Sequence, residues 1–170
     1  MTHFRPRTVL ETMLAEIALA ARQDAARRHE AVAEAIGAFI ARPGLLDGRD
    51  CPCSPDRYIR HLLHSDSAGG YAVVALVWRP GQMSPVHAHK TWCALGVQQG
   101  VLTETYYTPG EPPVPAATRL LAPGATSHGA ARPDLIHRLA NLSCHTAISI
   151  HCYGVGFDDF GDGVNQVFAA

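Results

Sequence analysis

Two histidines, His87 and His89, stand one residue apart between Gly81 and Gly100. Short apolar runs precede and follow this stretch, which is typical of β-strands. Residues i and i+2 of a strand face the same side, so both imidazoles can reach one metal ion. Imidazole is a good ligand for zinc, copper, iron and nickel. The pair is a weak signal by itself, because many such pairs bind no metal.

A three-histidine site needs one more imidazole from the downstream sequence. The histidines that follow Gly100 are His128, His137, His145 and His151. His137 lies in a run, Leu135–Leu142, whose apolar residues are compatible with a strand. His128 and His145 lie in loop-like contexts, where we expect them on the surface or just outside a site.

Arg60 is a candidate for binding an acidic substrate, because a guanidinium matches a carboxylate with two hydrogen bonds. It lies in 56–64, where Ser54 as N-cap and Pro55 at the first helical position predict a short helix. Tyr58 falls on the apolar face of that helix. Spacing alone favours an ordinary solvent-exposed charge for Arg60.

The elements that must position these residues change in character along the chain. Residues 7–23 and about 27–41 have apolar residues at helical spacing. From Tyr71 onward, short β-type runs alternate with Gly and Pro, which favours a sandwich or barrel. We expect one mostly-β domain over 1–170, with a helical part (about 1–66) packed on a β-barrel (about 67–170).

The composition excludes several classes of protein. The 170 residues carry a formal net charge of −1 spread along the chain, so we expect neither nucleic-acid nor membrane binding. The first residues lack the apolar core of a signal peptide, and a cytoplasmic location is expected. Five cysteines in such a chain predict reduced thiols. Cys51 and Cys53 lack a second cysteine pair, so zinc binding there is a minor alternative.

The stretch around the histidine pair resembles the first motif of the cupin superfamily, G-x5-H-x-H-x3,4-E-x6-G. The matching residues are Gly81, His87, His89 and Gly100. Cys93 stands where the motif has Glu, and His137 with Asn141 matches the H-x3-N end of the second motif. The resemblance implies a double-stranded β-helix barrel, or jelly roll. Its metal would be held inside by His87, His89 and His137.

Without the motif glutamate, three neutral imidazoles leave a divalent metal with its full charge and with open positions. Such a site favours an anionic ligand such as a thiolate, and sulfur together with imidazole suits Fe(II). Zinc, nickel or copper would also bind three histidines. A metal-binding sensor and a zinc or manganese isomerase are alternative functions, although cupin isomerases usually keep the glutamate.

A second resemblance is more specific. The segment Ser149–Tyr153 reads S-I-H-C-Y, and the cysteine dioxygenase family carries S-x-H-x-Y after its third ligand. The stretches RYIRHLL and HRLANLS also resemble that family, and the likeness runs from about Tyr58 to Asp158. The chain is therefore similar to a cupin-type thiol dioxygenase, an arginine-carrying bacterial member of this family.

The resemblance implies a role for each residue. Fe(II) would be the cofactor, and a small thiol and O2 would be the substrates, with a sulfinic acid as product. Arg60, with Tyr58 beside it, would bind the substrate carboxylate. Tyr153, steered by His151 and Ser149, would hydrogen-bond to the reacting groups, and Cys93 could form a thioether with Tyr153. A packed apolar thiol is the alternative for Cys93.

Arg60 also bears on which thiol is used. Relatives that resemble 3-mercaptopropionate dioxygenases carry Gln there and an Arg near the C-terminus, whereas this C-terminal segment has no Arg. L-Cysteine, giving cysteine sulfinic acid, is therefore the favoured substrate. 3-Mercaptopropionate remains open, as does mercaptosuccinate, for which His61 or Arg138 could bind a second carboxylate. The sequence does not indicate an oligomeric state.

Overall fold

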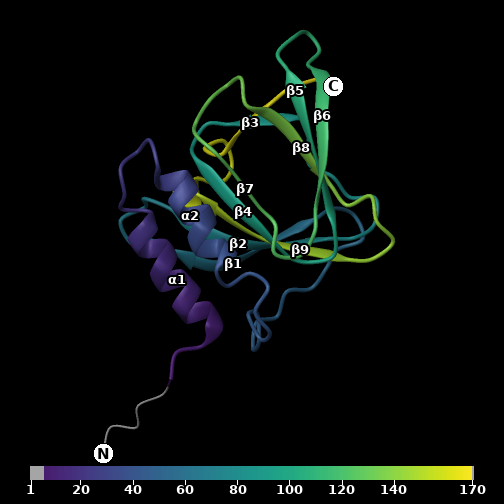
Figure 1. The fold of residues 1–170 in the computed structure, drawn as a ribbon. Helices are drawn as coiled ribbons and strands as arrows, with labels where there is room; N and C mark the ends of the chain where they lie inside the picture. Colours follow the sequence, from purple (N-terminus) through teal and green to yellow (C-terminus); the bar gives the residue numbers. More distant parts are fainter. Residues whose placement is uncertain (1–5, 170) are drawn as a thin grey trace, which may run out of the picture.

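Two five-stranded antiparallel sheets face one another, and two helices lie outside one of them (Figure 1). The computed structural model describes residues 6–169. The helices are α1 Val9–Ala20 and α2 Arg28–Gly37, and η1 Phe157–Asp159 is a 3-10 turn. The first sheet has the order β1 Ile59–Ser65, β2 Ala72–Trp78, β9 Ala147–Tyr153, β4 Cys93–Gln99, β7 Thr126–Gly129. The second has the order β10 Asn165–Val167, β3 His87–His89, β8 Ile136–Ala140, β5 Leu102–Thr108, β6 Val114–Leu121. The mostly-β, jelly-roll expectation is confirmed.

The two helices form where apolar periodicity predicts them. Thr8 caps α1 through a reciprocal pair of hydrogen bonds with Glu11. Met13 and Ile17 of α1, and Ile36 of α2, have no exposed surface. They pack on the outer face of the first sheet, where residues of β2, β4 and β9 complete the cluster.

Strand β2 is buried on both faces because it lies between the helices and the barrel interior. Val73 and Ala75 belong to the cluster under the helices, whereas Leu76 and Trp78 belong to the cluster inside the barrel. The period-two alternation of strand side chains produces this division. Strand β9 divides in the same way, so its Ser149, His151 and Tyr153 share the interior side.

The segment predicted as a helix over 56–64 is a strand, and that prediction was wrong. The apolar spacing is misleading because the pairing of β1 with β2 shifts between Leu62 and His64. The irregularity falls at Leu63, which is buried while its neighbour Leu62 is exposed. Ser54 therefore caps no helix; its carbonyl accepts a hydrogen bond from the Gln82 side chain.

The five cysteines have free thiols, as the sequence predicts. Within 6–169, no helix has the length and apolar character needed to cross a membrane.

Candidate active site

Three histidines from two adjacent strands converge inside the barrel. His87 and His89 lie on β3, and His137 lies on the adjacent β8, directly opposite His87 in the pairing register. One ring nitrogen of each lies within 4.8 Å of the other two. The predicted ligand set is therefore brought together, and of the four downstream candidates it is His137 that completes it.

The hydrogen bonds of the three rings fix which nitrogen faces the centre. His87 Nδ1 donates to the Pro85 carbonyl at 2.9 Å and His89 Nδ1 to Asn165 Oδ1 at 3.0 Å. His137 Nδ1 donates to Glu104 Oε1 at 2.9 Å. Each proton is thus held on Nδ1, and each Nε2 is left as a lone-pair donor. The residues fit a metal ion, since the Nε2 atoms of His89 and His137 face one another at 3.0 Å.

The site also keeps the imidazoles of His87 and His89 uncharged. Burial, together with the neighbouring His137, lowers the pKa of His87 to about 4. The same two causes lower the pKa of His89 well below its usual value. Neutral imidazole is the form that binds a metal, so these two ligands need not lose a proton near pH 7.

Glu104 is a functional residue that the sequence reasoning missed. Its carboxylate on β5 is fully buried and accepts hydrogen bonds from His137, Ser127 and Arg119. Burial would raise its pKa, but the bonds from His137 and Arg119 outweigh that effect and hold it at about 2. A buried anion thus orients one ligand, as carboxylate–histidine–metal triads do. Without knowledge of the β5–β8 pairing, no sequence signal separates Glu104 from a surface glutamate.

Asn165 of β10 was missed for a similar reason, because it lies 76 residues from the His89 ring it orients. Its pairing partner in the sheet is His89 itself.

Arg60 points into a cavity that the three histidines, Tyr58 and Tyr153 also line. Its Nε is buried and has no hydrogen-bond partner among the described residues. A buried N–H without a partner is costly, so the position of this half-buried guanidinium calls for an anionic ligand. The interpretation of Arg60 as a solvent-exposed helix charge is excluded by this placement. Tyr58 supports the Arg60 side chain, since the guanidinium carbon of Arg60 lies 5.6 Å from the centre of the Tyr58 ring.

Ser149, His151 and Tyr153 form one hydrogen-bonded chain along β9. The indole of Trp78 donates to Ser149 Oγ at 2.9 Å, and Ser149 contacts His151 Nε2 at 2.8 Å. His151 Nδ1 lies 3.1 Å from the Tyr153 hydroxyl.

The direction of these hydrogen bonds follows from their first donor, the Trp78 indole. Trp78 can only donate, and the Ser149 hydroxyl is fully buried with His151 as its remaining partner. Ser149 therefore donates to His151, which donates from Nδ1 to Tyr153. Burial, with a contribution from the positive Arg60, lowers the pKa of His151 to about 3 and keeps it neutral. The Tyr153 proton is left to point into the cavity, and burial raises the pKa of that phenol well above its usual value.

Cys93 begins β4 and lies opposite Tyr153 in the register between β4 and β9. Burial raises the pKa of the Cys93 thiol, which favours the protonated form. The predicted proximity of the two side-chain positions is confirmed. Cys152 faces the helices instead, as its alternation with Tyr153 predicts.

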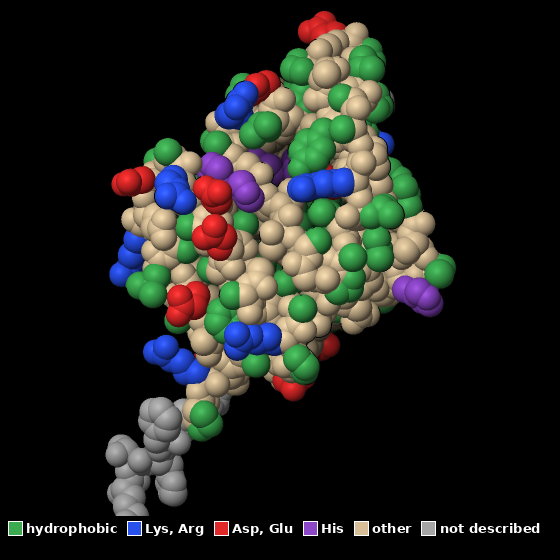
Figure 2. Space-filling model, in the orientation of Figure 1, with side chains coloured by type: hydrophobic (Ala, Val, Ile, Leu, Met, Phe, Trp, Pro, Cys, Tyr) green, Lys and Arg blue, Asp and Glu red, His purple; other side chains and the backbone are tan. Residues whose placement is uncertain are grey.

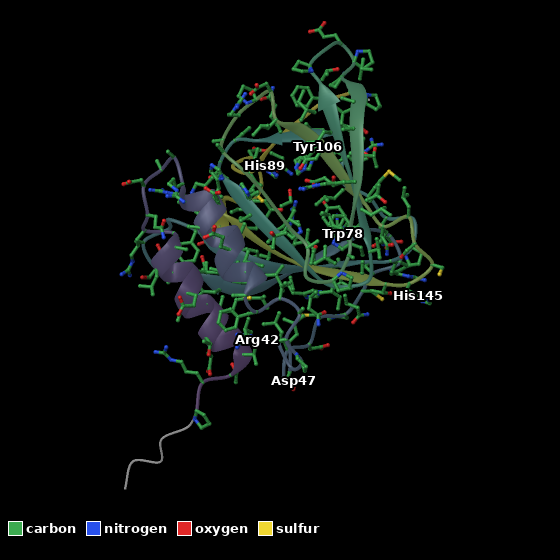
Figure 3. All side chains as sticks on the ribbon, viewed as in Figure 1. Arg42, Asp47, Trp78, His89, Tyr106 and His145 are labelled. Carbon is green, nitrogen blue, oxygen red and sulfur yellow. The ribbon has the colours of Figure 1, made fainter. Side chains whose placement is uncertain are left out.

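Other candidate residues lie away from the Arg60 cavity. His61 is bonded to the Pro52 carbonyl, and neither it nor Arg138 lines that cavity. His145 lies on a loop far from His89 (Figure 3). Asn141 ties the end of β8 to the Trp78 and His145 carbonyls through its side-chain amide.

Comparison with known structures supports the barrel. A conserved uncharacterized protein with a double-stranded β-helix domain from Klebsiella pneumoniae is similar over 70% of this chain and 90% of its own, with a TM-score of 0.52 and 18% identity. Peruvianin-I, a cysteine peptidase from Thevetia peruviana latex, is similar over 69% of this chain and 71% of its own, with a TM-score of 0.51 and 13% identity. At these identities the likeness concerns the fold alone.

The family follows from the sequence that builds the site. The family model described as cysteine dioxygenase type I matches residues 51–161. This range contains Arg60, the three histidines and the β9 chain of hydrogen bonds. The chain belongs to the cysteine dioxygenase type I family.

Proposed function

We propose that the protein is a non-haem Fe(II) thiol dioxygenase that converts a small thiol carboxylate, L-cysteine first, to its sulfinic acid. One observation carries the proposal: the unpaired Arg60 shares a cavity with three metal-facing histidines and the Tyr153 hydroxyl. Bound iron would supply redox chemistry and open coordination positions. We propose Fe(II) as the metal, because three imidazoles and a substrate sulfur suit this ion.

The protein's own residues position the thiol. Arg60 binds the carboxylate with two hydrogen bonds, which fixes the substrate at one end and turns its sulfur towards the histidines. Tyr58 stacks on Trp78, with ring centres 4.2 Å apart, and closes the side of the cavity. His87, His89 and His137 hold the metal through Nε2.

Tyr153 acts as a neutral hydrogen-bond donor. Because His151 donates to its oxygen, the phenol is oriented and its proton is available to an oxygen atom of the substrate or of O2. The Trp78–Ser149–His151 chain holds this proton position without a charge. An oriented donor in a buried site costs no reorganisation during the reaction.

3-Mercaptopropionate is the second candidate substrate. Arg60 would bind its carboxylate equally well, and no Asp or Glu lines the cavity to pair with the ammonium group of cysteine. Mercaptosuccinate is less favoured, because Arg60 is the only Lys or Arg among the lining residues and a second carboxylate would lack a partner.

Oxygen uptake by protein loaded with Fe(II) under anaerobic conditions tests the proposal. Cysteine, 3-mercaptopropionate, cysteamine and mercaptosuccinate are compared side by side, and the product is identified by mass spectrometry. We expect uptake with cysteine and formation of its sulfinic acid. No uptake with any of the four thiols would overturn the proposal and favour a metal-binding sensor or a non-oxidative enzyme. The predicted cytoplasmic location is a separate matter for localisation experiments.

We further propose that Cys93 and Tyr153 form a thioether during turnover. Their backbone positions face one another across β4 and β9, and the thiol is buried next to the metal ligands. Forming the bond removes one hydrogen from each residue, with dioxygen as the oxidant. The intact mass should fall by two hydrogens after turnover with cysteine, and not in a Cys93→Ser variant. An unchanged mass in fully active protein would rule out a functional cross-link.

A further inference from the structure

Two cavities meet at the three-histidine site. The first, which we call the arginine chamber, is the cavity lined by Arg60, Tyr58 and Tyr153. The second, the apolar chamber, is lined by Cys93, Tyr106, His128, Ala130 and Leu135, among others. His89, Leu95 and His137 border both, so each cavity reaches the same ligands from its own direction.

The apolar chamber reaches the protein surface at residues that do not line the arginine chamber. Its rim includes the exposed His128 and Leu135, and Leu135 is 37% exposed. Figure 2 shows histidine side chains within a hollow on this side of the molecule. Figure 3 places Tyr106 and His89 at the same end of the barrel.

The lining chemistry of the two chambers differs. The arginine chamber offers a cation and the Tyr153 hydroxyl. The apolar chamber contains no Lys or Arg, and its one acidic residue, Glu104, has its carboxylate already bonded to His137, Ser127 and Arg119. A thiol carboxylate or a sulfinate entering there would lose its hydration and meet no cation. A small uncharged molecule has no comparable hydration to lose when it enters the apolar chamber.

We infer that the apolar chamber is the route by which dioxygen reaches the metal centre, while the thiol occupies the arginine chamber. This inference rests on the proposed function. A thiol bound through Arg60 fills the first chamber, and dioxygen must then approach the remaining side of the centre. The second chamber reaches His89 and His137 on a path that the bound thiol leaves open.

Leu135 offers a site for testing the route, since it lies at the rim and is partly exposed. Its Cδ1 would be 3.5 Å from a Cβ placed on Gly129, so a larger side chain at 135 narrows the chamber beside β7. Leu135→Trp is the blocking variant, and Ala130→Phe is a second one on the same rim. Leu142→Trp is the matched control, because Leu142 is 65% exposed and lines neither chamber.

Steady-state kinetics of the Fe(II)-loaded proteins are measured with oxygen varied at saturating cysteine, and with cysteine varied at saturating oxygen. We expect Leu135→Trp and Ala130→Phe to raise KM for oxygen several-fold while KM for cysteine and iron affinity stay unchanged. Leu142→Trp should match the wild type. A rise in KM for cysteine alone would show that the thiol uses this chamber, and unchanged constants in both variants would exclude the route.

Xenon provides a readout that needs neither metal nor turnover, because it enters apolar cavities. Pressurising the metal-free protein should shift the methyl resonances of Leu95, and Leu135→Trp should abolish the shift. Absence of the shift in the wild type would contradict the inference even if turnover occurs. A wild type that shows the shift but oxidises no thiol would defeat the proposed function, and the assignment to dioxygen would fall with it.

Discussion

In the proposed function, substrate recognition depends on Arg60. We expect Arg60→Gln to lower kcat/KM for cysteine by a factor of 10² or more, since a charge-assisted bidentate pair of about 3 kcal/mol is lost. Cysteamine, which has no carboxylate, should be affected far less. Oxygen-uptake kinetics with both thiols measure the difference.

Arg60→Lys is the matched control for that experiment. It keeps the charge but not the two-pronged geometry, so its loss with cysteine should be intermediate. Equal losses for cysteine and cysteamine in Arg60→Gln would contradict a carboxylate-binding role.

Glu104 acts on the metal through His137. Glu104→Gln preserves the shape of the side chain but replaces the anion, so it removes the charge that strengthens this ligand. We expect divalent metal affinity to fall by about 10- to 100-fold, the usual effect of losing such a carboxylate. Anaerobic titration with Fe(II) or Co(II), followed by calorimetry, measures it.

Thr105→Ser is a suitable control for Glu104→Gln, because Thr105 is the next residue on β5 and its hydroxyl contacts Thr118 instead of the site. Unchanged metal affinity in a folded Glu104→Gln protein would show that the carboxylate only fills space.

At the scale of elements, the contact between α2 and β4 depends on a residue without a side chain. A Cβ on Gly96 would lie 2.6 Å from Ile36 Cγ2 and 3.1 Å from Ile40 Cγ1. Gly96→Val should therefore lower the free energy of unfolding by roughly 1–3 kcal/mol, the usual cost of overpacking. Urea denaturation measures this change.

A second substitution separates overpacking from other causes. Ile36→Ala in the Gly96→Val background makes room for the new side chain, so the two effects should not add. Simple additivity of the two losses would indicate that the valine acts elsewhere.

Local patterns predict the elements better than the contacts between them. The two helices and the β-region follow from periodicity, and His87 with His89 is visible as a pair because both lie on one short strand. Strand β1 was misread because its bulge hides the alternation, although Arg60 itself was identified. Glu104 and Asn165 are invisible for another reason: each acts on a ring 33 or 76 residues away. Only the pairing of strands in the folded sheet brings Glu104 to the His137 ring and Asn165 to the His89 ring.

At the scale of the whole molecule, burying neutral histidines makes stability depend on pH. The folded pKa of His151 is about 3, below its usual 6.5, so the unfolded chain binds this proton more tightly. Above about pH 6.5 this difference in proton binding has no effect on the free energy of unfolding. Below that pH, the free energy of unfolding falls as the pH drops towards 3. The full loss from this group is roughly 5 kcal/mol.

Urea denaturation of the metal-free protein between pH 7 and pH 4 tests this dependence. His151→Asn cannot take up the proton, so its free energy of unfolding should fall less steeply with acidification. Parallel curves for the two proteins would show that folding does not lower the pKa of His151.

The 3.0 Å approach of His89 Nε2 and His137 Nε2 has a consequence for how the protein is made and handled. With each ring already held by an oxygen behind it, the ligand atoms are gathered at one point before an ion arrives. The tightness of binding then follows the general order of divalent metals, in which copper, nickel and zinc exceed iron. Nothing in the three imidazoles reverses that order, so the metal content of the purified protein will follow the supply during expression. Growth in iron-supplemented, zinc-depleted medium and metal analysis of the product should precede any judgement about activity.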